Sequence, residues 1–427
     1  MANNTDSNIT RQLLRRFLPD FEAARVLSKA VDTQMFQGRF NPASGDYVDI
    51  KKPHRYIAKE TATGDISALT ANSITSGKAT AIVQQYLTVD IDWTNKEEAL
   101  SLDQLTEILR PAATELVTKL ETNFCDFMYA HAALSVGVPD NPIDAWSDLA
   151  GQMSLMKAMG VPGGPYYSVM NPFTIQNLAS VQTGLSADPS RLVQTAWEMA
   201  SISTPFAGMR AISSNSMSSY TTGDAGVSGT LSATPDATYL THKDTYVQSL
   251  AVTGLTAAAT VTAGTILEFT GTGADARSYI QPITRKTIFG ADGGPIPWRC
   301  VVTEDVTLDG AGAGTLLVSG PAIFEANGQY NNISAALTSG DAFDVLGTAD
   351  TEYQPDLFFT KDAFSIAFVK LPKLYSTDTV AVQKDGVSIR CSKYADGDAN
   401  TQKIRFDILP AYGVMNPWFA GQGFGAP

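Results

Sequence analysis

Charged residues are scarce in this sequence. Asp, Glu, Lys and Arg make up 17% of the 427 residues, against about 25% in typical soluble domains. A low charge density suits a protein whose surface is partly covered by copies of itself, because the centres of interfaces are depleted in charge. It equally suits a β protein rich in Thr, Ser, Gly and Ala, so composition alone leaves both interpretations open.

Positive charge is scarcer than negative charge. There are 30 Lys and Arg against 43 Asp and Glu, which gives a net charge of −13. Nucleic-acid binders gather basic residues into patches that neutralise phosphates, and the nearest approach here is the pair Arg15 and Arg16. Tight, direct DNA binding is therefore not expected. An acidic wall repels DNA and suits a container better than a binder.

Cysteine and long apolar runs are also lacking. Cys125, Cys300 and Cys391 are odd in number and far apart, which argues against a disulfide framework and favours buried, inert thiols in a reducing compartment. No stretch approaches the roughly 20 apolar residues of a membrane span, and the polar first ten residues lack the apolar core of a signal peptide. We expect a soluble protein that is made in the cytoplasm.

Motifs for catalysis or metal binding are missing as well. His54, His131 and His242 are isolated, whereas a zinc site needs clustered ligands, and no G-x-S-x-G elbow is present. A triad assembled in space stays possible, but the sequence gives it no support. We expect no catalytic residue, no cofactor and no metal, and therefore no enzyme.

Three Gly- or Asp-rich segments have simpler interpretations than binding sites. Residues 271–275 and 290–294 are not followed by a helical pattern, which a phosphate-binding loop requires, so we expect hairpin loops. Residues 396–400 begin like a calcium loop, but Thr401 and Asp407 stand where the full pattern needs Gly and Glu. A turn between two strands is the better interpretation.

The first quarter of the chain predicts segments that need partners. Residues 1–35 predict an arm of two short helices separated at Pro19, neither long enough to be stable alone. Residues 36–93 predict an extended hairpin, with one strand around 47–50 and a return strand over 81–93. The polar segment 60–78 between them has too little apolar content to fold on itself, so we expect it to be mobile or to reach a partner.

The strongest helical pattern lies at 101–137. Apolar residues recur there at spacings of three and four, and Pro111 predicts a short helix to Leu109 followed by a long one from 111 to about 134. Residues 140–222 are mixed, with helices expected at 145–160, 174–181 and 189–200 and strands at 166–170 and 209–213.

The composition changes near residue 221. From there to about 350 the chain is rich in Thr, Ala and Gly, with short strands expected at 246–252, 265–269, 299–302, 315–318 and 342–346. This spacing predicts an inserted all-β barrel or sandwich. Mixed α/β character then returns, and Ile404, Phe406 and Ile408 alternate with Lys403, Arg405 and Asp407 as in a half-buried strand. The fold class expected is α+β.

Several stretches resemble the major capsid proteins of tailed phages. They include residues 63–67, 102–109, 182–185, 195–198 and 371–374, and most distinctively 393–400 through 409–412. More closely, the chain resembles the coat proteins of lambdoid short-tailed phages that carry an inserted β-barrel domain. The resemblance covers nearly the whole chain and implies the Hong Kong 97-type capsid fold.

The resemblance implies a division of the chain into seven parts. These are an N-terminal arm (1–35), an extended loop region (36–93), a peripheral domain with the spine helix (94–144), a first axial part (145–222), the inserted barrel (223–350), a second axial part (351–392), and a return strand with the C-terminal tail (393–427). It further implies a virion protein that self-assembles, without cofactors, into hexamers and pentamers of an icosahedral shell around double-stranded DNA. A scaffolding protein, a portal at one vertex and a procapsid that expands on maturation belong to the same implication.

Candidate contact residues follow from the segments that need partners. We expect subunit contacts at charged or aromatic positions in the polar loop, in the insertion loop 241–246 and in the Gly-rich tail: Glu60, Asp65, Lys78, Lys243, Asp244 and Trp418. Trp418 alternatively anchors the C-terminus. Asp20 and Glu22 are candidate scaffold contacts, since scaffolding proteins of this family often present basic helices that an acidic surface would complement.

Two other function classes remain open. One is a phage tail or decoration protein whose β domain binds carbohydrate on an aromatic platform, for which the chain offers Tyr239, Tyr246, Tyr279, Trp298 and Tyr330. The other is an intracellular hydrolase, which needs a pocket of convergent polar groups. The size of the assembly separates both from a shell protein.

Overall fold

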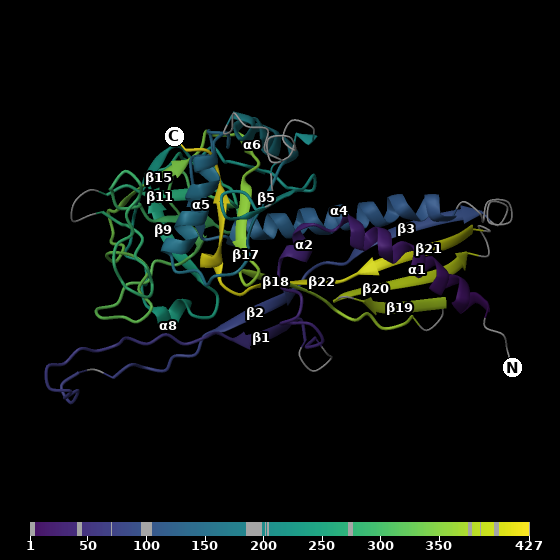
Figure 1. Cartoon of the computed structure of the whole chain (residues 1–427), viewed down its shortest axis with the longest axis horizontal. Helices are drawn as coiled ribbons and strands as arrows, with labels where there is room; N and C mark the ends of the chain where they lie inside the picture. Colours follow the sequence, from purple (N-terminus) through teal and green to yellow (C-terminus); the bar gives the residue numbers. More distant parts are fainter. Residues whose placement is uncertain are drawn as a thin grey trace. The chain divides into compact units, whose positions relative to one another are not determined.

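Two sets of chain segments pack separately in the computed structural model (Figure 1). The structure describes residues 5–40, 45–69, 71–94, 105–184, 199–200, 202, 205–271, 276–374, 378–384, 386–396 and 401–426. The first unit consists of Met1–Asp49, Thr80–Cys125 and Phe364–Gly413, and the second of Ile50–Ala79, Asp126–Ala363 and Val414–Pro427. The finer division into seven parts stays a prediction.

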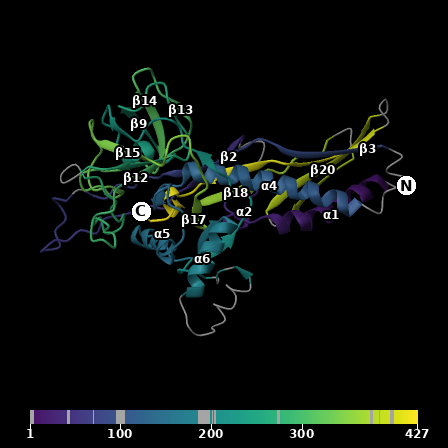
Figure 2. The same cartoon turned by 90° about the horizontal axis from the view of Figure 1, so that it is seen from above.

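In the first unit, a long helix lies along a four-stranded antiparallel sheet (Figure 2). The sheet has the order β19 (Asp378–Lys384), β20 (Val387–Asp396), β21 (Thr401–Ile408), β3 (Leu87–Thr94). The helix is α1 (Thr5–Ala24), and its Phe17 ring stacks on Phe406 of β21 with centroids 4.2 Å apart. The expected pair of short helices is therefore wrong, since α1 continues through Pro19. Phe17 and Phe21 are both buried on either side of this proline, and their packing offsets the lost backbone bond.

The buried carboxylate of Glu121 joins the N-terminal arm to a second helix of the first unit, α4 (Leu105–His131). Glu121 accepts backbone hydrogen bonds from Leu27 (2.5 Å) and Ser28 (3.2 Å) and a further bond from the Ser28 hydroxyl. These donors open the short helix α2 (Leu27–Ala30). Free N–H groups at a helix start need acceptors, and Glu121 supplies one from a residue distant in sequence.

Strand β21 confirms the predicted half-buried strand with one correction. Ile404, Phe406 and Ile408 are buried as expected, but Asp407 is fully buried too. Its carboxylate accepts from the Arg390 guanidinium at 2.6 Å and from Arg405 Nε at 2.5 Å. A buried carboxylate needs such partners, and the strand pattern alone does not reveal them.

The expected return strand over 81–93 is two strands in different sheets. β2 (Lys78–Val83) belongs to a sheet of order β1 (Tyr47–Lys51), β2, β22 (Pro410–Val414), β18 (Phe364–Phe368), whereas β3 pairs with β21. The predicted hairpin of β1 and β2 is confirmed. The partly alternating pattern over 81–93 did not reveal the change of sheet.

The helix α4 (Leu105–His131) is one continuous helix with Pro111 inside it. The expected division into two helices at Pro111 is therefore wrong. Leu109, Ala113, Leu116 and Leu120 bury one side of the helix around and beyond the proline. His131 ends the helix and stacks on Phe127, and burial lowers the pKa of its imidazole.

In the second unit, a five-stranded mixed sheet forms the centre of the core. Its order is β4 (Leu134–Val136), β23 (Ala420–Gly423), β17 (Asp356–Thr360), β5 (Tyr166–Met170), β6 (Arg210–Ser213). β4 runs parallel to β23 and β5 parallel to β6. The helices α5 (Trp146–Ala158) and α6 (Pro172–Gly184) confirm two predicted helices, while the helix expected at 189–200 lies almost entirely outside the described residues.

The middle of the chain forms a closed six-stranded barrel. Its order is β11 (Ile266–Phe269), β12 (Arg299–Val302), β14 (Gly314–Ser319), β9 (Val247–Thr253), β8 (Ser228–Leu231), β15 (Ala342–Leu346). Large buried side chains, among them Phe269, Trp298 and Phe343, contribute to its core. The five strands expected here are present, which confirms the α+β class with an all-β barrel.

Short elements complete the second unit. They are β7 (Tyr220–Thr221) with β16 (Glu352–Tyr353), β10 (Thr260–Val261) with β13 (Val306–Thr307), α8 (Tyr239–His242) and η3 (Pro417–Phe419). The segment 290–294 is a hairpin loop as predicted, closed by a 2.8 Å bond from Gly290 N to Gly294 O. Residues 272–275 and 397–400 lie outside the described residues.

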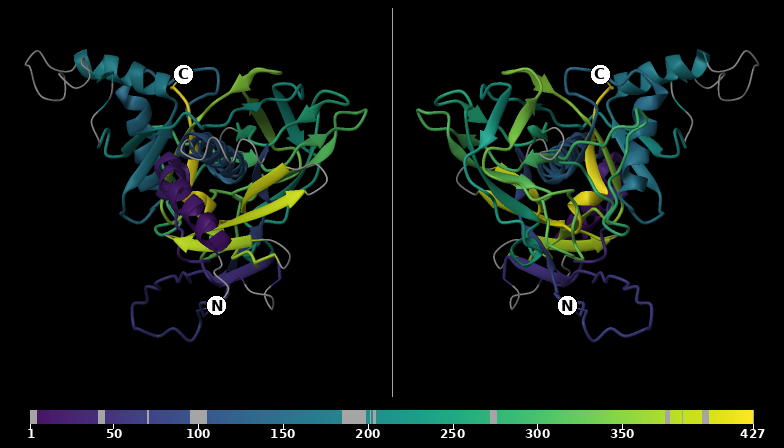
Figure 3. Two further views of the ribbon diagram at one scale, coloured as in Figure 1. Left: turned by 90° about the vertical axis from the view of Figure 1, so that its right-hand side faces the viewer. Right: turned by 90° about the vertical axis from the view of Figure 1, so that its left-hand side faces the viewer.

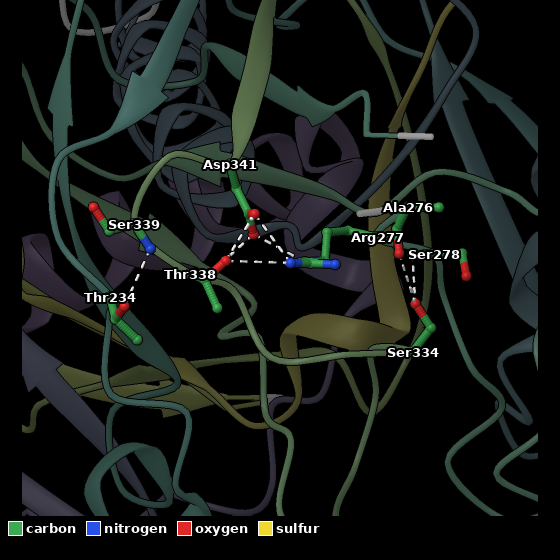
Figure 4. A network of polar contacts seen from close by, with 8 residues as sticks. All are labelled: Thr234, Ala276, Arg277, Ser278, Ser334, Thr338, Ser339 and Asp341. Carbon is green, nitrogen blue, oxygen red and sulfur yellow. Dashed lines mark hydrogen bonds and ion pairs between the residues drawn. The ribbon is translucent and has the colours of Figure 1, made fainter. Parts of the chain in front are cut away.

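A buried ion pair fixes the connections of the barrel (Figure 4). Arg277 donates to both carboxylate oxygens of Asp341, at 2.9 and 3.0 Å. Asp341 also accepts from the Thr338 backbone and hydroxyl, both at 2.9 Å. Both carboxylate oxygens of Asp341 therefore accept hydrogen bonds, and a buried charged group requires such partners.

Candidate assembly surface on the extended loop

The segment between β1 and β2 is an open loop with a bonded stem (Figure 3). We call residues 52–77 the extended loop. Its stem is closed by a 2.8 Å bond from Lys52 N to Gly77 O. Further out, the Asn72 amide exchanges two hydrogen bonds with the backbone of Ile57, at 2.9 and 3.2 Å. The His54 ring adds a third contact across the loop, 3.2 Å from Thr75 O. Among the described residues of the loop, no large apolar side chain is buried.

The outer part of the loop exposes apolar side chains. Ile66 is 62% exposed, Leu69 41% and Ile74 74%. Next to Ile66, Asp65 accepts a 2.9 Å bond from Ser67 N, and this bond lowers the pKa of its carboxyl. Water-exposed apolar groups at the end of a projecting loop are typical of a surface that another molecule covers.

The stem of the loop rests on a turn of the six-stranded barrel. We call residues 239–246, which include α8, the barrel turn. The amine of Lys52 donates to the carbonyl oxygens of Lys243 (2.9 Å) and Asp244 (3.4 Å). It also lies 3.3 Å from the centroid of the Tyr246 ring. The side chain of Lys52 is only 7% exposed, so a basic residue near the start of the loop is buried against the barrel.

The other side of the stem contacts the same turn. Lys78 N donates to the Asp244 carboxylate at 3.0 Å, and the second carboxylate oxygen pairs with the Lys243 amine at 2.7 Å. A Cβ placed on Gly77 would come within 2.7 Å of the Lys243 carbonyl. Glycine at 77 therefore permits the close approach of the two backbones.

A second turn of the barrel holds the middle of the loop. The Gln329 amide donates to Ser73 O at 2.7 Å, and Arg55 N donates to the Tyr330 hydroxyl at 3.3 Å. The rings of Tyr330 and Tyr239 stack with centroids 3.5 Å apart, which ties this turn to the barrel turn. A groove of about 860 Å³ lies between loop and barrel, and residues lining it include Ile57, Leu69, Asn72, Leu240, Asn327 and Tyr330.

The predicted contact residues therefore fall into two groups. The structure brings together Lys78, Lys243 and Asp244 where loop and barrel meet. Glu60 and Asp65 are exposed on the outer part of the loop. Lys52 and Gln329, which complete the junction with Tyr246 of the expected loop 241–246, were missed. No sequence pattern relates residues 191 or 256 positions apart.

The remaining predicted residues lie elsewhere. Trp418 is 8% exposed and packs on the backbone of Gly320 and the edge of Tyr279. This contact lies within the second unit and favours the anchoring role. Asp20 and Glu22 are half-buried on α1 in the first unit.

The structure offers little to the other two function classes. Of the five aromatic residues considered as a carbohydrate platform, Tyr279 and Trp298 are fully buried, and Tyr239 and Tyr330 nearly so.

Among the described residues, no group of three or more His, Cys, Asp or Glu side chains is arranged to hold a metal ion. The three cysteines are buried and unbridged. No described helix has the length and hydropathy of a membrane span.

Comparison with known proteins identifies the family. Residues 1–425 match the family of the "P22 coat protein - gene protein 5". The chain is 41% identical, over 430 residues and the full length of both chains, to the "Major capsid protein" of Acyrthosiphon pisum secondary endosymbiont phage 1.

Solved structures of low sequence identity also align along most of the chain. One from Mycobacterium phage Che8 has a TM-score of 0.45 at 13% identity, covering 93% of this chain and 90% of that one. The capsid of cyanophage P-SCSP1u has a TM-score of 0.42 at 12% identity, covering 90% and 84%. On the strength of the full-length sequence matches, the chain belongs to the P22 coat protein family and is a phage major capsid protein.

Proposed function

We propose that copies of this chain assemble into hexamers and pentamers of an icosahedral shell of the Hong Kong 97 type, with the extended loop as a main contact between subunits. The observation that carries this proposal is the loop itself. Its base is fixed to the barrel by Lys52, Lys78 and Gln329, while its outer part exposes Ile66 and Leu69. A fixed base aims the loop in one direction, which lowers the ordering cost of a contact.

The charged candidates have supporting roles in this proposal. Glu60 and Asp65 on the exposed loop add polar contacts around the apolar residues, as at the rim of an ordinary interface. Lys78, Lys243 and Asp244 contribute by holding the loop, and the Lys243 and Asp244 side chains retain partial exposure for a neighbouring subunit. Trp418 fixes the C-terminal segment within its own subunit.

The proposed partners follow from charge and location. A scaffolding protein with basic helices binds near Asp20 and Glu22 on α1 during procapsid formation, and a portal occupies one vertex. The packaged DNA is enclosed without sequence-specific contact, since the chain carries a net charge of −13. Assembly takes place in the host cytoplasm, which the unbridged cysteines support. The role is structural, without a catalytic step, and the shell expands on maturation.

The test is assembly of variants of the loop. We expect the unaltered chain, expressed with its scaffolding protein, to form closed shells in sedimentation and negative-stain microscopy. The double variant Ile66→Ser, Leu69→Ser should remain as folded subunits, because two exposed apolar contacts are lost. Val227→Ser is the matched control, because Val227 is also an exposed apolar residue but lies on the barrel.

Either of two results would contradict the proposal. Shells formed by the double variant at the same rate as by Val227→Ser would remove the loop from the assembly contacts. A chain that stays a monomer or small oligomer with scaffold at high concentration would overturn shell formation itself.

A further inference from the structure

The junction of loop and barrel contains a buried basic residue whose environment is unusual. Lys52 is enclosed by the barrel turn, and its amine faces two carbonyl oxygens and an aromatic ring. A buried ammonium is costly unless it is paired with a carboxylate. The nearest carboxylate, Asp244, is already bonded to the Lys243 amine and to Lys78 N. Among the described residues, the amine of Lys52 is therefore held by two carbonyl groups and an aromatic ring, and Asp244 acts on it through space.

We propose that Lys52 is a positioning residue that fixes the extended loop on the inserted barrel within each subunit, and that protonation of its amine loosens this attachment. The proposal concerns the single subunit, although its consequence for assembly rests on the proposed function above.

The carbonyl acceptors of the barrel turn do not require a charged amine. A neutral amine has two N–H donors, enough for the carbonyl oxygens of Lys243 and Asp244, whereas the third N–H of an ammonium faces only the Tyr246 ring. The turn is constrained to present them: Tyr246 has a φ of 55°, uncommon for a residue with a side chain, and its N–H closes the turn on His242 O at 2.9 Å. The two acceptors and the ring are thus in place before the loop binds.

Opposing effects act on the proton of Lys52. Burial disfavours the charged form, Asp244 favours it, and Lys243 disfavours it; burial is the largest effect and lowers the pKa of Lys52 from 10.5 to about 7. The Tyr246 ring also favours the cation. Other titratable groups around the junction are Lys51, His54, Arg55, Lys78, Tyr239, His242, Tyr246 and Tyr330.

The direction of the pH effect follows from linkage. A released Lys52 in water keeps its ordinary pKa, so the released loop binds more protons than the attached loop between about pH 7 and 10.5. Attachment therefore strengthens as the pH rises through this range, and below about pH 7 it stays at its weakest, because Lys52 is protonated in both states. A loop attached by an ordinary surface lysine would show no such dependence.

Hydrogen exchange in the unassembled, full-length subunit tests this inference. Peptides covering 53–59 and 71–79 report the amides of Arg55 and Lys78, which are bonded across the junction. After correction for intrinsic exchange rates, we expect protection in the unaltered chain to rise by at least about tenfold from pH 6 to pH 9.

Variants separate Lys52 from its neighbours. Lys52→Met keeps the length of the side chain without a titratable group, so its protection should not vary over this range. Lys52→Arg stays charged, and its loop should be less protected at pH 9 than that of the unaltered chain. Lys51→Met, at the exposed neighbouring lysine, should keep the unaltered profile. Peptides from the barrel strands show whether each variant is folded.

Two results would overturn the inference: protection in the unaltered chain that does not change with pH, or a pH dependence that persists in Lys52→Met and so belongs to His54 or another group. Should Lys52→Met not fold, the unaltered chain and Lys52→Arg still decide. Because none of these measurements needs a shell, failure here is distinct from failure of the proposed assembly.

Discussion

At the scale of single residues, one acid of the second unit is buried without a partner. Asp356 begins β17, is 2% exposed, and has a carboxylate oxygen that makes no hydrogen bond to the described residues. Burial raises the pKa of this carboxyl well above its ordinary value. Gln152 approaches the same face of the sheet beside Gly423, the register partner of Asp356. Burial therefore favours the protonated form of this carboxyl.

We expect Asp356→Asn to stabilise the second unit at neutral pH. Between the unfolded and folded pKa values, the folded protein binds one more proton at Asp356, so stability falls as pH rises through that window. Asparagine does not titrate there. The gain should be larger at pH 7 than near pH 4, where the aspartate of the unfolded chain is itself largely protonated. Urea unfolding at both pH values measures it.

The control for this prediction is Asp362→Asn. Asp362 is exposed in the turn after β17, so its substitution should leave the unfolding midpoint nearly unchanged at both pH values. An Asp356→Asn chain that is less stable than the unaltered chain at pH 7 would mean that the carboxylate is ionised and has a partner.

At the scale of elements, two helices run through prolines. α1 contains Pro19 and α4 contains Pro111, although proline in a helix interior removes a backbone hydrogen bond and crowds the preceding turn. Both helices bury aromatic or leucine side chains around the proline. Burying one such side chain contributes roughly 1.5–3 kcal/mol, so several outweigh the cost of one proline.

Pro111→Ala should therefore stabilise α4. Proline in a helix interior destabilises the folded protein by about 3 kcal/mol. Proline also restricts the unfolded chain, and losing this restriction destabilises the variant by only about 0.4–1 kcal/mol. Pro111 is exposed, so little packing is lost. We expect a net gain on the order of 2 kcal/mol, measured by chemical denaturation.

A suitable comparison for Pro111→Ala is Thr114→Ala. Thr114 is also exposed on α4, and its hydroxyl only bonds back to Arg110 O, so its effect should be a few tenths of a kcal/mol. Equal effects of the two substitutions would show that the helix bears no cost at Pro111.

At the scale of the whole molecule, assembly brings together subunits of like charge. Each copy carries a net charge of −13, and such copies repel at long range. Screening shortens this repulsion, since the Debye length falls from about 30 Å at 0.01 M to about 10 Å at 0.1 M salt. A contact that stays attractive in salt is an apolar one, such as the contact proposed for Ile66 and Leu69.

We expect the subunits alone to assemble faster as salt rises from about 0.01 to 0.1 M, where the Debye length shortens threefold. Light scattering follows the rate, and sucrose of equal osmolality serves as the control for crowding. Assembly that slows with salt would instead show that ion pairs between subunits dominate the contact.

The amino-acid sequence predicted the class of the fold and several of its elements. Period-two apolar patterns predicted β21 and the barrel strands, and the apolar spacing of three and four predicted the long helix, because these patterns record which side chains of one element are buried. The polar, Gly- and Thr-rich composition of 60–78 predicted a segment without its own core. Short stretches of sequence, most distinctively residues 393–400 through 409–412, carried the resemblance to phage capsid proteins.

The contacts between elements that are distant in the sequence became known only from the three-dimensional structure. The meeting of Lys52 with the barrel turn, the burial of Asp407 between two arginines, the Glu121 cap on α2 and the continuity of α1 and α4 through their prolines depend on residues far apart in the chain. Local sequence patterns predict that a side chain is buried, but they do not predict which residue it contacts. The charge of a buried lysine or aspartate depends on the residues around it. The protonation of Lys52 therefore depends on how the loop packs against the barrel.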